Sequence, residues 1–398
     1  MDFNKPLDFS EFPQVSSEEW HQKILSEMKG KELPSYIRDL NFKPFYTSED
    51  INSSDSYYIN KPSSDWAVRE LIKADDVATA IRLSKTAIDS GVQELLLEYT
   101  EKPVVENVKQ LLDNIPLKDI AVHFNISDAP EVIINTLKEK IKEDKLRRYE
   151  VKGSLSLDPI GYWILNDLLK YRQFDQLAEL VNSTGEIPNF KFITINSHPF
   201  HNLGLPAIKE LAFSLSAAVE YIEQLKEREC RPEDVIQSIQ FSISVGKHYF
   251  MEISKLRALR LLWPNILKAY NINSDIPLII NARTSFYSKS LIDPYVNIIH
   301  NTTEAMAAIS GGCDSLTVIP FDEDLAEPGE FSSRISRNTS YILKEEAYFN
   351  KVADPTAGSY FIETLTNILA REIWILFQIV EENGGLIKAQ QKGVIEIA

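Results

Sequence analysis

The chain has 398 residues, of which 44% are apolar and 25% charged, as is typical of a globular protein with a substantial core. Acidic residues outnumber basic ones by 58 to 42, which gives a formal net charge of −16. Because such a charge repels phosphate backbones and anionic headgroups, we expect neither a nucleic-acid partner nor a membrane-surface partner.

The first residues lack a basic region followed by an apolar stretch, so no secretory signal is expected. No helical stretch offers about 18 uncharged apolar residues, so no membrane span is expected either. Two cysteines, Cys230 and Cys313, are too few for a disulfide framework and suit a reducing compartment. The sequence therefore predicts a cytoplasmic protein.

Residues 1–62 are predicted to be an N-terminal extension. A helix is expected near Glu18–Met28, capped by Ser16 or Ser17, and loops rich in Ser, Asn, Asp and Pro follow it. The extension carries aromatic side chains, among them Phe42 and Tyr46, which a closed domain has little room to bury. We expect it to pack on the outside of the main domain or on a partner.

From about residue 65, short β-rich runs alternate with amphipathic helices, and a closing helix is predicted over about 360–382. Several runs are nearly all apolar, as expected of parallel strands buried on both faces. Eight strand–helix units over residues 63–398 predict a (β/α)8 TIM barrel, an α/β fold, and a doubly wound open sheet is the alternative. The eight predicted strands are Glu94–Tyr99, Asp119–Phe124, Tyr149–Leu157, Phe190–Asn196, Ser238–Val245, Pro277–Ala282, Asp314–Ile319 and Lys351–Ala353.

In such a barrel the loops that follow the strands carry the chemistry. The loop after the fourth predicted strand contains two imidazoles, His198 and His201, within a few residues. Metal binding by this pair is disfavoured, since Pro199 prevents a regular helix and no acidic or thiol ligand is close. A histidine there could instead act as a general acid or hydrogen-bond donor, or simply hold the loop.

Three basic residues, Lys255, Arg257 and Arg260, have helical spacing and could bind a phosphate, but a solvated helix face is the expected arrangement. Asp354-Pro355 is expected in the loop after the eighth strand, as the start of a turn. No Ser-His-Asp set, paired cysteine motif or carboxylate pair can be assigned.

Several segments resemble the adenosylcobalamin-dependent methylmalonyl-CoA mutase family, in order and spacing, over nearly the whole chain. The segments that carry the resemblance are residues 246–263 (GKHYFMEISKLRALRLLW), 336–339 (SRNT), 344–347 (KEEA), 352–366 (VADPTAGSYFIETLT) and 382–389 (ENGGLIKA).

Within that family the chain resembles the small, beta-type subunit. The catalytic subunit's Arg-Gln-Tyr-Ala-Gly run is missing from the comparable place, residues 66–72 (WAVRELI). Residues 317–322 (TVIPFD) and 200–205 (FHNLGL) are similar to the small subunit's versions of these loops. The resemblance therefore implies a non-catalytic chain, in which His201 is a vestigial counterpart of the catalytic histidine.

The resemblance implies a heterodimer with a large catalytic subunit that interconverts methylmalonyl-CoA and succinyl-CoA by radical chemistry. Acyl-CoA and adenosylcobalamin would be bound at the level of that complex. The family's cobalt-ligating Asp-x-His-x-x-Gly motif does not occur in this sequence, so we expect no cobalamin-binding domain and no cofactor or metal site on this chain.

Two alternatives remain open. One is a self-sufficient acyl-CoA mutase barrel that works with a separate cobalamin subunit; the missing run in residues 66–72 argues against it. The other is an unrelated barrel enzyme such as an aldolase, for which Lys247 or Lys351 would have to form a Schiff base.

Overall fold

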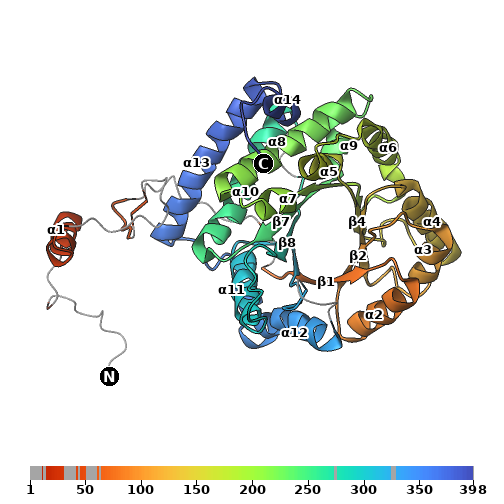
Figure 1. Cartoon of the computed structure of the whole chain (residues 1–398), viewed down its shortest axis with the longest axis horizontal. Coiled ribbons are helices and arrows are strands. Elements are labelled where there is room, and N and C mark those ends of the chain that lie inside the picture. The colour runs from red at the N-terminus through yellow and green to blue at the C-terminus, as the bar shows by residue number, and fades with distance from the viewer. Residues whose placement is uncertain are drawn as a thin grey trace, which may run out of the picture.

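The computed structural model contains a ring of parallel strands surrounded by helices (Figure 1). It describes residues 11, 15–30, 42–43, 45–50, 61, 64–272, 276–323 and 329–397. The domain boundary expected at residues 62 and 63 lies outside these residues, so the division of the chain stays a prediction.

All nine strands belong to one parallel sheet in the order β5-β4-β3-β2-β1-β9-β8-β7-β6. Only Phe192 separates β5, which pairs with β4, from β6, which pairs with β7, so this interrupted strand closes the ring. The predicted (β/α)8 barrel is thus confirmed. The strands are β1 Ala67–Lys73, β2 Glu94–Glu98, β3 Ala121–Ile126, β4 Gly153–Leu157, β5 Phe190–Lys191, β6 Ile193–Asn196, β7 Ile239–Val245, β8 Ile280–Thr284 and β9 Ser315–Thr317.

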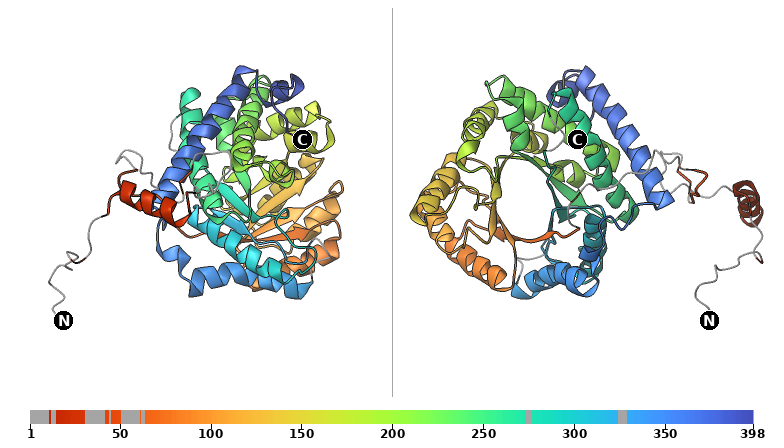
Figure 2. Two further views of the ribbon diagram at one scale, coloured as in Figure 1. Left: turned by 60° about the vertical axis from the view of Figure 1, so that its left-hand side comes forward. Right: turned by 180° about the vertical axis from the view of Figure 1, so that it is seen from behind.

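Helices cover the outside of the barrel, as the view from behind in Figure 2 shows. The α-helices are α1 Ser17–Glu27, α2 Val77–Asp89, α3 Val105–Leu112, α4 Pro130–Glu143, α5 Pro159–Asn166, α6 Tyr171–Asn182, α7 His198–Asn202, α8 Ala207–Lys226, α9 Pro232–Gln237, α10 Tyr249–Ala269, α11 Val296–Ser310, α12 Glu330–Tyr341, α13 Tyr360–Glu382 and α14 Leu386–Gln391. The long closing helix predicted over 360–382 is α13. None of the helices among the described residues is both long and apolar enough to cross a bilayer.

The apolar core lies between the strands and the helices. Side chains alternate across a strand, so Leu95 and Leu97 of β2 and Val122 and Phe124 of β3 all face outward, where they are completely or almost completely buried. The intervening positions face the barrel interior, and many of them are polar.

One strand of the barrel was missed, and one of the predicted strands was wrong. The barrel begins with β1, which sequence reasoning missed because Arg69, Glu70 and Lys73 make the segment look like a charged loop. At the other end Lys351 belongs to a short 3-10 helix, Phe349–Lys351, with no strand beside it to supply a hydrogen-bond ladder. The barrel still has eight strands when β5 and β6 are counted as one interrupted strand. Because β1 comes before the first predicted strand, each of the other predicted strands is one place later in the barrel than expected. The loop with His201 therefore follows the fifth strand.

The described part of the extension begins with helix α1, whose N-cap is Ser16 in a reciprocal bond with Glu19. Further along, Phe42 and Tyr46 are buried against Phe361 of α13, with ring centroids 4.9 and 6.2 Å apart. Phe42 and Tyr46 thus pack on a helix of the barrel, whereas Trp20 and Phe45 are exposed and pack on each other, with ring centroids 5.0 Å apart.

Candidate functional site

A pocket with about 350 Å³ of space opens where the loops after β6, β7 and β8 meet. This is the face at which parallel barrels place their chemistry. The polar groups around it are His201, Glu210, Lys247, His248, Glu252, Tyr287 and Ser288. The loop selected from the sequence therefore lines this pocket, through His201.

His201 has both ring nitrogens engaged. Nδ1 lies 3.0 Å from a carboxylate oxygen of Glu210, and Nε2 lies 2.8 Å from the Ser285 hydroxyl. Because a carboxylate only accepts, Nδ1 donates to Glu210, while Nε2 is engaged by the Ser285 hydroxyl. In this arrangement no N–H of the imidazole points to a substrate carbonyl. A Cβ added at Gly246 would lie 3.1 Å from the ring, so the loop after β7 also packs closely on it.

A buried ion cluster holds this histidine in place. Lys255 is fully buried and its ammonium lies 3.0 Å from Glu210 and 2.6 Å from Glu252. Burial alone would raise the pKa of Glu210, but the charge of Lys255 and the contact with His201 outweigh it and hold the pKa below its ordinary value. Burial by itself would lower the pKa of Lys255, but the charges of Glu210 and Glu252 outweigh it and raise that pKa above its ordinary value.

The expectation that Lys255, Arg257 and Arg260 form a solvated face was wrong, because all three are buried. Arg257 contacts Asp354, at 2.6 Å to one oxygen, and Glu363 of α13 at 2.9 Å. Helix α10 is covered by α8, α11 and α13, so most of its circumference lies inside the protein. Helical spacing alone could not reveal that both faces of α10 are covered.

Asp354 also departs from its predicted place. It follows the 3-10 helix instead of a strand, and it lies against Arg257. The Asp354-Pro355 pair therefore anchors the segment before α13 and does not line the barrel mouth.

His198 is not paired with His201 around a common ligand. Its Nε2 lies 2.8 Å from the Ser242 hydroxyl and its Nδ1 contacts Ser244, both on β7. Burial, followed by the charge of Arg283, lowers the pKa of His198 well below its ordinary value, so the ring is neutral. In the described ranges no three His, Cys, Asp or Glu side chains converge as metal ligands.

A polar network that sequence reasoning missed crosses the barrel interior. Arg69 of β1 donates to Glu94 at 2.8 Å and to Asn281 of β8 at 2.9 Å, and lies 3.1 Å from His123 of β3. His123 in turn lies 2.8 Å from the Ser154 hydroxyl of β4. The contacts of Arg69 with His123 and Asn281 each skip one strand of the sheet, so these side chains lie inside the barrel, which in most such barrels holds branched apolar residues.

A sequence signal for this network did exist. Serines or a glutamine occupy every second position of β4 and β7, where the strands were read as almost continuously apolar. Burial, together with the charge of Arg69, lowers the pKa of His123. At Glu94 the charge of Arg69 and the contacts with Arg69 and His123 outweigh burial and hold the pKa well below its usual range.

The three buried histidines of the barrel, His123, His198 and His201, thus have partners at both ring nitrogens. A cobalt ligand needs a free imidazole nitrogen, so these residues do not fit cobalamin coordination.

The residues proposed for a Schiff base also fail to form a site. Lys247 lines the pocket but is exposed, and Lys351 is exposed and away from any strand end. A Schiff-base lysine is usually desolvated so that its amine is neutral, and neither position provides such an environment.

Comparison with known proteins gives a consistent result. A family model described as methylmalonyl-CoA mutase matches residues 103–398. The methylmalonyl-CoA mutase small subunit of Porphyromonas gingivalis is 32% identical over 98% of this chain and 66% of its own length. The small subunit of Streptomyces virginiae is 28% identical over 97% of this chain and 67% of its own. Methylmalonyl-CoA mutase of Rhizobium meliloti is 35% identical, and the match covers 73% of this chain and 42% of that protein. The chain thus spans between about two fifths and two thirds of the length of these relatives.

Proposed function

Because this chain belongs to the methylmalonyl-CoA mutase family, we propose that it is the small, non-catalytic subunit of a heterodimeric methylmalonyl-CoA mutase. Its partner is then a large catalytic subunit, which binds the acyl-CoA and adenosylcobalamin. The cofactor supplies the radical chemistry when it is bound there.

The state of His201 carries the proposal. A residue that stabilises charge on a thioester carbonyl must offer an N–H toward it, but both ring nitrogens of His201 are engaged within the protein, Nδ1 by Glu210 and Nε2 by Ser285. The network around Arg69 supports the same conclusion, because its hydrogen-bonded side chains already occupy part of the barrel interior. The names of the small-subunit relatives are a further support.

The test is reconstitution with the large subunit from the same source. We expect a one-to-one complex by light scattering, turnover of methylmalonyl-CoA by the complex with adenosylcobalamin, and none by this chain with adenosylcobalamin. Turnover by this chain with a separate cobalamin protein, in the absence of the large subunit, would overturn the proposal in favour of a self-sufficient barrel.

A further inference from the structure

Five large apolar side chains around the loop between β8 and α11 are turned to solvent. Their exposed fractions are 64% for Tyr287, 65% for Leu291, 98% for Ile292, 64% for Tyr295 and 65% for Ile299. We call them the 287–299 surface. At ~200 Å² per large side chain their separate exposed areas add up to on the order of 700 Å².

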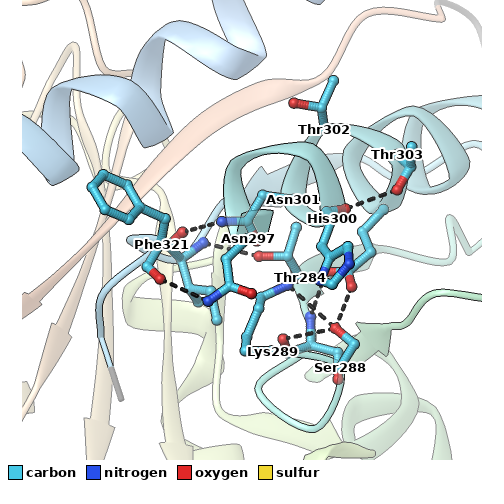
Figure 3. Close-up of polar contacts among 12 residues, drawn as sticks. Thr284, Ser288, Lys289, Asn297, His300, Asn301, Thr302, Thr303 and Phe321 are labelled. Atoms are coloured by element: carbon cyan, nitrogen blue, oxygen red, sulfur yellow. Dashed lines mark hydrogen bonds and ion pairs between the residues drawn. The ribbon is translucent and has the colours of Figure 1, made fainter. Parts of the chain in front are cut away.

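The backbone beneath this surface is held by buried polar contacts, which Figure 3 shows. Lys289 and Glu304, both almost fully buried, form an ion pair at 2.6 Å. Asn297 is buried and bonds to both the backbone N–H and C=O of Ser290 and to the carbonyl of Phe321, at 2.7–3.0 Å. The exposed side chains therefore stand on a fixed base, and a preorganised surface loses little conformational entropy when it binds.

The charges of the segment favour a partner that differs from this chain. Of the two charged residues between 287 and 299, Lys289 is neutralised by Glu304, which leaves Asp293 as an exposed carboxylate among the apolar side chains. A symmetric dimer through this surface would bring two copies of Asp293 together, each on a chain with net charge −16. A different protein can place a basic group there.

The exposed area also agrees with a stable interface. A standard-size complex buries ~800 Å² on each partner, close to the order of 700 Å² estimated for the 287–299 surface. Ile292 is the most exposed of the five, so it has the most apolar area to bury in a complex.

We propose that the 287–299 surface is the contact surface for the large mutase subunit, with Ile292 as its apolar anchor and Asp293 opposite a basic side chain of the partner. The proposal rests on the function proposed above, because it places the partner of that function on this chain.

The experiment measures the dissociation constant of the complex with the large subunit for Leu291→Asp and Ile292→Asp. Both side chains are so exposed that the fold does not depend on them. The matched control is Val105→Asp, a 53% exposed side chain on α3, across the barrel from α11 (Figure 1). We expect the two variants to weaken binding about thirtyfold or more, as the loss of an anchor does, and the control to stay within about twofold.

The outcomes separate the two proposals. If the unmodified chain does not bind the large subunit, the proposed function fails and this inference fails with it. If the chain binds but Leu291→Asp and Ile292→Asp bind equally well, the inference alone is wrong. If the unmodified chain forms a homodimer that Ile292→Asp dissociates while the heterodimer is unaffected, a second copy occupies the surface and the inference is overturned.

Discussion

Replacing His201 with alanine distinguishes a structural histidine from a catalytic one, since the two roles predict opposite changes in stability and turnover. The variant loses one hydrogen bond to a buried carboxylate, worth ~1.5–3 kcal/mol, and one to the Ser285 hydroxyl, worth ~1 kcal/mol. Glu210 keeps Lys255 and Ser197 as partners, so its charge stays compensated. We therefore expect the free energy of unfolding to fall by about 2–4 kcal/mol.

For a chain of this length the entropy of unfolding is roughly 0.8 kcal/mol per kelvin, so the melting temperature should fall by about 3–5 °C. In the reconstituted complex, kcat/KM should stay within about fivefold of the unmodified value, under ~1 kcal/mol. Differential scanning calorimetry and an assay of succinyl-CoA formation give the two readouts.

The control is His248→Ala, which removes an exposed imidazole from the same pocket and should change neither value. A hundredfold loss of kcat/KM for His201→Ala, ~2.7 kcal/mol, with an unchanged melting temperature would refute the reasoning and show that the histidine acts on substrate.

Three further predictions concern the ion clusters and the cofactor. Arg257→Met leaves Asp354 and Glu363 buried without their counter-charge, so the free energy of unfolding in urea should fall by ~3–5 kcal/mol; a loss below ~1 kcal/mol would contradict the structure. Burial and the neighbouring Glu220 raise the pKa of Glu381 to about 7, so the folded state holds a proton that the unfolded chain releases above about pH 4.5. The stability that this group contributes is present below about pH 4.5 and is lost as the pH rises through about 7. Glu381→Gln should therefore stabilise the protein by about 1–3 kcal/mol at pH 8 and not at pH 4. Equal melting curves of the two proteins at pH 8 would refute this. Calorimetric titration of this chain with adenosylcobalamin should show no binding at micromolar concentrations, and a site of that affinity would contradict the assignment of the cofactor to the partner.

The loop with His198 and His201 shows how far the sequence leads toward the site. Placement of a histidine-rich loop at the carboxyl end of a barrel strand follows from the strand–helix alternation, because parallel strands bring all such loops to one face. One partner of His201, Glu210 of α8, is only nine residues along the chain, but the other, Ser285 at the end of β8, is 84 residues away, and only the folded barrel brings it within hydrogen-bonding distance.

By itself the sequence indicated an α/β fold of eight strand–helix units, because the alternation of β-rich runs and amphipathic helices allows few arrangements that bury every apolar face. It left a doubly wound open sheet as an alternative, and only the tertiary structure showed that β5 and β6 close the ring. The sequence also determined α13 from its apolar periodicity. It could not show that Arg69 belongs to a strand, since Arg69 and Glu70 become favourable in β1 only when Glu94 and Arg337, from other segments, lie beside them. The burial of Lys255 and Arg257 was likewise decided by tertiary structure, because a charge enters the interior only where carboxylates from distant segments offset its loss of hydration.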